Sequence, residues 1–355
     1  MLRPRASSTS IPCAAVLLFL SLFIALQKET GAQQQNVNAL ETDVPGIRLY
    51  RQGDISGAID ALRAAVRQRK DNSDAWHYLG LALNRNGELK EARKAFETAV
   101  KLRPGFTESH IGLAYTLLLL NKLGEAGRAA ERAVALDPQI AEAHYVLGAV
   151  RLKANMPAKA LDEAEAALRI RADLSPAHLL KTEALFGVYI EAGTSLGKEP
   201  SREARLKGHK EARLHLGEAA KSLAKYLALS PNAPNADFWR QQLEALRIHA
   251  GPVGGDITED STYSASEVTK ATIRTRTEPQ YTQAARQNGI NGKVILLAVF
   301  ASDGEVKHIL VIRSLSHGLT EEAIKAARGI KFDPATKDGR PVSQFIQIEY
   351  DFHIH

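Results

Sequence analysis

Two regions of the chain differ in the period of their hydrophobic residues. Between about residues 39 and 172, small apolar residues return every 34 positions. From residue 270 onward, short apolar runs and alternating stretches are separated by Asp-Gly pairs. The first pattern is typical of stacked helix pairs, and the second is typical of strands joined by turns. The chain is therefore predicted to be multidomain, with an all-α solenoid followed by a small α+β domain.

The helical repeat is carried by alanine, leucine and proline. The positions that recur with this period are Ala58, Ala92, Ala126 and Ala160, then Leu79, Leu113 and Leu147, then Pro104 and Pro138. Small residues let the two helices of a pair approach closely, and proline ends the second helix. The pattern resembles the tetratricopeptide repeat. Because such units bury their apolar faces only by stacking, the resemblance implies an α-solenoid over residues 39–250.

The solenoid is expected to be irregular at its ends. Pro45-Gly46 is expected to interrupt the first helix. The polar segment near 193–208 predicts a surface insertion or an extended helix, and residues 237–249 predict a capping helix. The glycine-rich residues 251–269 predict a flexible linker that few contacts cross.

Residues 270–355 predict an antiparallel sheet with two helices. Apolar runs at 293–300 and 306–312 flank Asp303-Gly304, which is a strong hairpin signal. A helix is expected to begin behind Thr320 as its N-cap. Residues 270–276 are expected to add a strand.

The end of this domain has its own signals. Asp338-Gly339 predicts another turn, and the closing strand follows at 344–352. That strand alternates apolar and polar residues, which predicts a sheet with one polar face and helices covering only the other.

The same region carries a series of motifs in a fixed order. They are Pro279-Gln280-Tyr281, Ala285-Arg286, Gly289-Ile290-Asn291-Gly292-Lys293-Val294, Asp303-Gly304-Glu305-Val306, Gly318-Leu319, Phe332-Asp333-Pro334-Ala335 and Asp338-Gly339. This series resembles the C-terminal domain of the TonB family of energy transducers. The family usually has proline after the tyrosine, where this chain has Thr282. The resemblance implies a periplasmic protein that binds a segment of an outer-membrane TonB-dependent transporter and couples it to an inner-membrane motor.

The closing strand is the predicted binding element. No later segment follows it to cover its outer side, and unpaired backbone groups on an edge strand favour pairing with another chain. The resemblance implies the same, since the family accepts a transporter segment as an added strand. The predicted contact residues are Pro279, Gln280 and Tyr281, together with Gln344, Ile346, Gln347, Ile348, Glu349 and Tyr350.

The first residues predict export. Arg3 and Arg5 precede an uncharged run of 16 residues at 11–26. Residues 1–32 are therefore either a cleaved signal peptide or an N-terminal membrane anchor, and both place the protein in the periplasm. The run contains no histidine and no Pro-rich spacer follows it, although both are typical of TonB-type transducers. A periplasmic tetratricopeptide scaffold or assembly factor without energy transduction is the alternative.

Charge and motif content narrow the function further. The net charge of +6 is spread thinly, and residues 277–355 carry 9 basic and 9 acidic residues, so no nucleic-acid partner is expected. The chain has no phosphate loop, nucleophile elbow or dinucleotide fingerprint. A non-enzymatic protein without cofactor or metal is predicted.

One row of side chains remains as a candidate in the solenoid. Trp76, His110, His144 and His178 occupy the same repeat position. Successive layers lie about 10 Å apart, which is too far for these residues to share one metal ion. They are predicted to be structural or to line a groove that takes a peptide.

Overall fold

The computed structural model describes residues 44–196, 202–233, 235–251, 262–263 and 268–353. The predicted signal peptide or anchor, residues 1–32, lies outside them. None of the described helices is both long and apolar enough to cross a membrane. The chain divides within α10, after Ala184, into two compact units.

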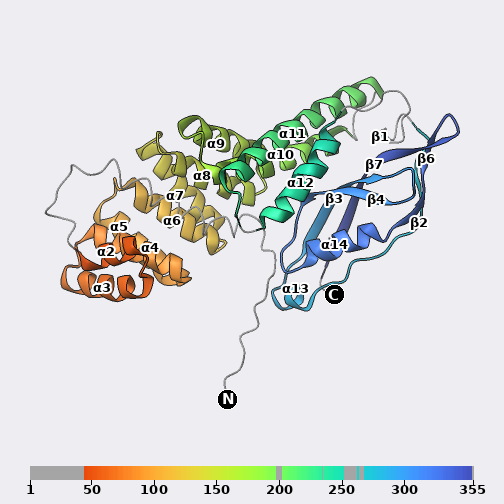
Figure 1. The fold of residues 1–355 in the computed structure, drawn as a ribbon. Helices are drawn as coiled ribbons and strands as arrows, with labels where there is room; N and C mark the ends of the chain where they lie inside the picture. Colours follow the sequence, from red (N-terminus) through yellow and green to blue (C-terminus); the bar gives the residue numbers. More distant parts are fainter. Residues whose placement is uncertain (1–43, 197–201, 234, 252–261, 264–267, 354–355) are drawn as a thin grey trace, which may run out of the picture. The chain divides into compact units, whose positions relative to one another are not determined.

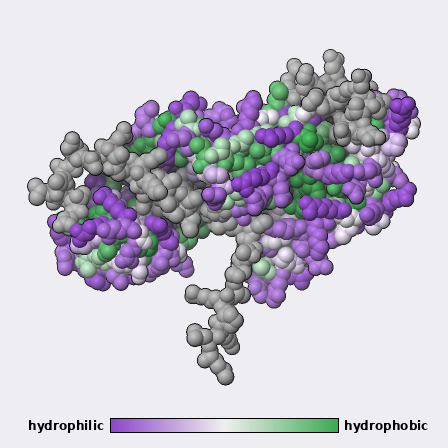
Figure 2. Space-filling model, viewed as in Figure 1, coloured by the Kyte–Doolittle hydropathy of each residue, from purple (hydrophilic) through white to green (hydrophobic). Residues whose placement is uncertain are grey.

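The first unit holds the part of the predicted solenoid up to Ala184, and the remaining helices expected up to residue 250 belong to the second unit (Figure 1). Consecutive helices pack in pairs, α4 with α5, α6 with α7 and α8 with α9. Hydrophilic residues cover most of the described surface on the side shown in Figure 2. The helices are α2 (Pro45–Gln52), α3 (Ile55–Gln68), α4 (Ser73–Asn86), α5 (Leu89–Leu102), α6 (Thr107–Leu119), α7 (Leu123–Leu136), α8 (Ala141–Lys153), α9 (Pro157–Ile170) and α10 (Ser175–Leu196).

Small residues at the repeated positions explain how closely the helices pack. Ala92, Ala126 and Ala160 are fully buried. Phe96 lies between two glycines, and a Cβ atom would come within 2.9 Å of its ring at Gly80 and 2.4 Å at Gly112. A larger side chain at these positions would force the helices apart.

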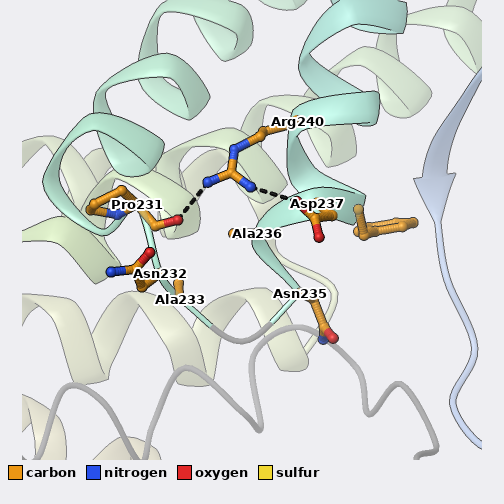
Figure 3. A pocket seen from close by; sticks show the side chains of 8 residues that line it. Pro231, Asn232, Ala233, Asn235, Ala236, Asp237 and Arg240 are labelled. Carbon is orange, nitrogen blue, oxygen red and sulfur yellow. Dashed lines mark hydrogen bonds and ion pairs between the residues drawn. The ribbon is translucent and has the colours of Figure 1, made fainter.

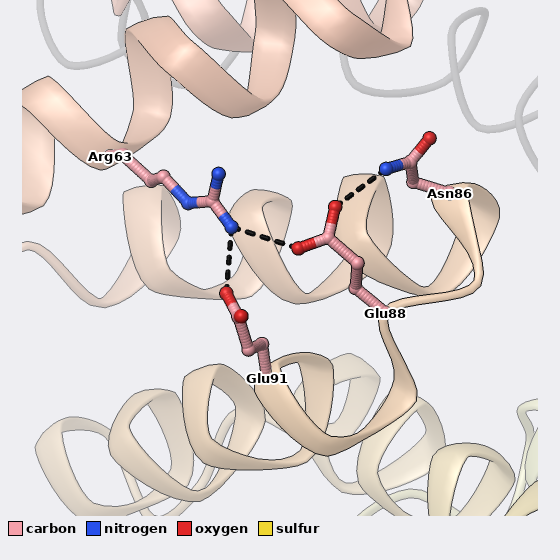
Figure 4. Close-up of polar contacts among 4 residues, drawn as sticks. All are labelled: Arg63, Asn86, Glu88 and Glu91. Atoms are coloured by element: carbon pink, nitrogen blue, oxygen red, sulfur yellow. Dashed lines mark hydrogen bonds and ion pairs between the residues drawn. The ribbon is translucent and has the colours of Figure 1, made fainter.

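A polar cluster ties α3 to the following helix pair (Figure 4). The Arg63 guanidinium donates to Glu88 at 2.9 Å and to Glu91 at 2.7 Å, and Asn86 donates to the other oxygen of Glu88 at 2.5 Å. Hydrogen bonding to Glu91, and then to Glu88, raises the pKa of Arg63. Because these side chains are partly exposed, their contribution to stability is small.

The start of the solenoid differs from the expectation. Pro45 begins α2 instead of interrupting a helix, because the first helical position needs no N–H donor and suits the fixed φ of proline. Gly46 packs against α3, where a Cβ atom would lie 2.5 Å from the Leu62 side chain. The Pro-Gly pair therefore places a short helix close to its neighbour.

The second unit begins with the rest of α10, followed by α11 (Arg202–Leu229) and α12 (Ala236–Ala250). The described parts of the segment near 193–208 are helical, as the extended-helix alternative predicts. The expected capping helix is present as α12, which packs against α11.

The terminal sheet has the strand order β1-β7-β3-β4 (Figure 1). β3 lies in the middle and pairs antiparallel with β4 and β7, while β1 pairs parallel with the start of β7. β6 also pairs with the start of β7, and β2 pairs with β5 in a separate ladder. The strands are β1 (Thr262–Tyr263), β2 (Thr272–Thr275), β3 (Gly292–Phe300), β4 (Val306–Arg313), β5 (Lys331–Asp333), β6 (Ala335–Lys337) and β7 (Arg340–Phe352).

Both predicted Asp-Gly turns are present. Asp338 and Gly339 have φ values of 52° and 77° and join β6 to β7. Two successive positive φ values are those of a type I′ turn, which suits a two-residue hairpin. Gly304 has φ 84° in the connection between β3 and β4. The strand expected at 270–276 is β2.

Two helices, α13 (Gln283–Gln287) and α14 (Leu319–Arg328), pack on one face of the sheet. Thr320 is not the N-cap of α14, contrary to the expectation, because the helix begins one residue earlier and Gly318 occupies the cap. The Thr320 hydroxyl instead accepts from the Leu315 N–H at 2.9 Å and donates to the Leu315 carbonyl at 2.7 Å. It fixes the loop before the helix.

The second face of the sheet is partly covered, which corrects the expected polar face. Ile295, Leu297 and Val299 of β3 point to this face and are buried. α12 packs here against β4. The polar face survives only toward the end of β7, where Gln347 and Glu349 are exposed. The expectation that few contacts cross the 251–269 segment therefore does not hold for α12.

Candidate functional site

The outward side of β7 is an edge of the sheet. The register between β7 and β3 is regular over nine residue pairs, so the N–H and C=O groups of alternate β7 residues face away from β3. The Arg276 side chain donates to the Glu349 carbonyl, so this residue faces outward. By the same alternation, the backbone groups of Phe345, Gln347 and Asp351 also face outward.

Most of this edge has no neighbouring strand. β1 pairs only with Ser343 and Gln344. Among the described residues, no strand pairs with the outward side of residues 345–352. At about 3.4 Å per residue this leaves roughly 27 Å of unpaired edge.

The structure separates the predicted contact residues of β7 into two groups. The backbone groups of Gln344, Ile346, Ile348 and Tyr350 face β3 by the alternation, and their side chains are buried or half-buried. Gln347 and Glu349 combine outward backbone groups with exposed side chains. Backbone pairing with a partner therefore depends on the odd-numbered positions.

The predicted residues before α13 lie near the end of the same strand. Tyr281 packs edge-on against Phe352 with 5.9 Å between ring centroids, and its hydroxyl donates to the Ile290 carbonyl. Pro279 is half-buried and Gln280 is exposed. The described contacts of Tyr281 hold α13 to the sheet. A partner contact for these three residues stays a prediction.

Thr282, where the family usually has proline, caps α13. Its hydroxyl accepts from the Ala285 N–H at 3.1 Å and donates to the His317 carbonyl at 2.6 Å. The substitution thus exchanges a rigid residue for a side chain that satisfies a helix end and a neighbouring loop.

Arg276 lies over the unpaired edge. Its guanidinium is 4.8 Å from the centre of the Tyr350 ring and 3.5 Å from the Glu278 carboxylate. Burial raises the pKa of the Tyr350 hydroxyl, so this group stays neutral. Arg276 was not among the residues predicted from the sequence to contact a partner.

The opposite edge, formed by β4, is covered by α12. The Val311 N–H donates to Gln242 Oε1 at 2.6 Å, and Gln242 Nε2 donates to the Ile309 carbonyl at 3.4 Å. His249 Nε2 donates to the His308 carbonyl at 2.8 Å. Two α12 side chains therefore take the place of a neighbouring strand. Sequence reasoning missed them, although Gln242 and His249 share one helical stripe with Phe238 and Ala245.

The His249 side chain is buried. Its ring lies 5.0 Å from that of Phe345, and the Arg213 guanidinium lies 4.6 Å from the Phe345 ring. Arg213 also donates to the His249 carbonyl at 2.9 Å. Burial lowers the pKa of His249 to about 4, so the ring is neutral near pH 7.

The row of repeat residues in the solenoid makes one shared contact. The ring nitrogens of Trp76, His110, His144 and His178 each bond the backbone carbonyl six residues earlier, at 2.9, 2.9, 3.1 and 2.9 Å. A carbonyl only accepts, so each ring donates. This contact gives the row a structural role, and lining of a peptide groove stays a prediction.

A shallow hollow lies between the end of α11 and the start of α12 (Figure 3). Arg240 crosses it, donating to Asp237 at 2.5 Å and to the Pro231 carbonyl at 2.6 Å. Arg240 and Asp237, the two charged side chains that line the hollow, therefore neutralise each other. No group of three His, Cys, Asp or Glu side chains in the described part of the chain is placed to hold a metal ion.

Two family models match the chain. The model of the Gram-negative bacterial TonB protein C-terminal domain matches residues 277–354. The tetratricopeptide repeat model matches residues 46–105 and 111–175. The chain joins tetratricopeptide repeats to a TonB C-terminal domain. Both domains are interaction domains, which supports a protein-interaction role. The comparison with curated proteins gives no match.

Solved tetratricopeptide structures resemble part of the chain. A MamA crystal structure is 24% identical, with a TM-score of 0.38, covering 50% of this chain and 96% of MamA. TTC0263 from Thermus thermophilus is 18% identical, with a TM-score of 0.42 and coverages of 57% and 95%. YrrB, described as having an unusual peptide-binding site, is 18% identical, with a TM-score of 0.35 and coverages of 52% and 99%. Likeness at this level supports no statement about function.

Proposed function

We propose that the TonB-type domain binds an extended segment of a partner protein as an added strand on the outward side of β7. The observation that carries this proposal is the outward side of residues 345–352, with which no described strand pairs and where alternate N–H and C=O groups face away from the sheet. Such an edge pairs readily with another strand. The partner implied by the family is a periplasmic segment of an outer-membrane TonB-dependent transporter.

The geometry favours Gln347 and Glu349 as the residues that would carry the binding. A partner strand bonds to the backbone of Gln347 and Glu349, and its side chains on one face meet the exposed polar end of β7. Most of the affinity comes from backbone groups, so side-chain changes on this strand have small effects and loss of an outward N–H has a large one.

Substitution of Gln347 tests this proposal. Fluorescein-labelled peptides that copy the periplasmic N-terminal segments of outer-membrane transporters of the same genome are titrated with the full chain. Gln347→Pro removes one outward N–H without touching the β3 ladder and should weaken binding on the order of tenfold or more. Gln347→Ala is the matched control and should bind as the original protein does.

Folding of the proline variant is checked by circular dichroism and thermal melting. A folded Gln347→Pro protein that binds the peptides with unchanged affinity would rule out strand addition at this edge.

We further propose that the protein works in the periplasm, either as a scaffold or as a link to an inner-membrane motor. The two roles differ in the fate of residues 1–32. Mass determination of the mature N-terminus separates them, because a cleaved chain cannot reach a motor within the membrane. The repeats over residues 46–175 suit a second protein partner in either role.

A further inference from the structure

Residues 271–276 run beside the outward edge of β7 and contact it at both ends. The Ala271 N–H donates to the Gln344 side chain at 2.9 Å, and the Arg276 guanidinium donates to the Glu349 carbonyl. The two contacts are equally spaced along both segments, so the segment runs parallel to β7. Residues 271–276 are called the strap below.

The strap is bound more weakly than a regular edge strand. Its backbone pairs with β5 and not with β7, and this register is irregular between Ile273 and Thr275. All four residues of β2 are exposed, Ile273 by 45%. The ion pair of Arg274 with Asp333 lies on the surface and contributes little. Ala271 packs against the two apolar clusters of the domain and anchors the start of the strap, whereas residues 272–276 are exposed and can leave the edge without uncovering a core.

We propose that the strap is an internal competitor for the β7 edge, and that Arg276 is the group a partner strand must displace. This inference rests on the proposed function. An added strand needs the Glu349 carbonyl as an acceptor for its own N–H, and Arg276 occupies that oxygen. The oxygen has a second lone pair, but an added strand would run about 4.8 Å from β7, through the space the guanidinium fills.

Three contacts hold Arg276 in this position. Besides the Glu349 carbonyl, the guanidinium meets the face of the Tyr350 ring at 4.8 Å and the Glu278 carboxylate at 3.5 Å. Each contact is partly exposed and individually weak. Together they cover the middle of the edge when no partner is present, which opposes pairing between two copies of the chain.

Substitution of Arg276 tests the strap in the full chain. Arg276→Ala removes the competitor and should tighten binding of the labelled transporter peptides on the order of fivefold. Arg276→Lys keeps the charge but lacks the planar guanidinium, so its affinity for the peptides should lie between those of Arg276→Ala and the original protein. Arg313→Ala, on β4, loses the same charge at the opposite edge and should bind as the original protein does. Weaker peptide binding by Arg276→Ala would indicate that Arg276 contacts the partner. The strap would then not be a competitor for the edge.

A second measurement needs no partner. Hydrogen exchange of the β2 amides, Thr272 to Thr275, should accelerate on the order of fivefold in Arg276→Ala and stay unchanged in Arg313→Ala. Unchanged exchange of these amides in Arg276→Ala would show that Arg276 does not hold the strap at the edge, even if the peptides bind. If no protein binds the peptides, the proposed function fails, and the strap is then decided by this exchange measurement alone.

Discussion

The two edges of the terminal sheet are protected in different ways. At β4, the buried side chains of Gln242 and His249 bond backbone groups of Ile309, Val311 and His308. At β7, the exposed side chain of Arg276 bonds the outward carbonyl of Glu349. A buried cover is costly to remove, while an exposed one is cheap to displace. The difference favours a stabilising role for the β4 edge and agrees with the proposed binding at β7.

Removal of α12 should have the largest effect on this comparison. A fragment of residues 270–355 would lose α12, which packs against β4, and with it cover of the second face, where Ile295, Leu297, Val299, Leu310 and Ile312 are buried. Each buried side chain of this size contributes about 1.5–3 kcal/mol, so their sum approaches the whole stability of a small domain. The fragment should aggregate or melt without cooperativity, whereas a fragment of residues 202–355 should melt cooperatively. Thermal melting and gel filtration measure both. A stable, monomeric 270–355 fragment would show that α12 is dispensable.

Loss of the Gln242 side-chain amide should have the next largest effect. Gln242→Leu removes the side-chain amide that bonds the buried Val311 N–H and the half-buried Ile309 carbonyl. Each orphaned group costs about 1–3 kcal/mol, so the free energy of unfolding in urea should fall by about 2–4 kcal/mol. Gln241→Leu, at the exposed neighbouring position, is the control and should change it by less than about 0.5 kcal/mol. Equal effects of the two substitutions would contradict the capped edge.

Acid should weaken the β4 side selectively. Burial lowers the pKa of His249 to about 4, below the ordinary value of 6.5 that it has when unfolded. Its contribution is complete above pH 6.5 and is lost as the pH falls toward 4, because the unfolded chain then binds the extra proton. Between pH 7 and 4.5 the loss should be roughly 2–3 kcal/mol.

Urea unfolding at both pH values measures this loss, and His249→Gln should reduce the difference. Burial also lowers the pKa of His77 in the solenoid, to about 3. The solenoid should therefore show its own loss of stability in acid, separate from that of the terminal domain. An unchanged pH dependence in His249→Gln would exclude His249 as the sensitive group.

The smallest effect is expected at the exposed end of β7. Lys293 pairs with Glu349 at 3.3 Å, and both side chains are nearly half exposed. Such surface pairs contribute about 0–1 kcal/mol. Lys293→Met should therefore shift the urea midpoint only slightly, in contrast to Gln242→Leu. A loss comparable to that of Gln242→Leu would remove the distinction between the edges.

The sequence predicted most of the architecture because the signals were local. The alanine period predicted the helix pairs, and Asp338-Gly339 predicted the turn before β7. The second face of the sheet was missed because the alternation of β7 was extended to the whole sheet. The continuous apolar run of β3, residues 294–300, already indicates a strand buried on both faces.

The site was predicted less completely than the fold. The closing strand is present as β7, and its role in binding stays a prediction. The direction of each of its backbone groups depends on its register with β3, which one sequence does not specify. Arg276 and Gln242 were missed because each acts through a contact more than 65 residues away in sequence. Thr320 was assigned as a cap from residue type alone, and the helix begins one residue earlier.

The shared carbonyl contact of Trp76, His110, His144 and His178 changes how this repeat position should be read. The property common to the four residues is a ring that carries an N–H, and not aromatic bulk or a titratable group. Tryptophan and histidine can then replace each other at this position of the repeat. Phenylalanine would match the profile of an aromatic residue but leave the preceding loop without its donor.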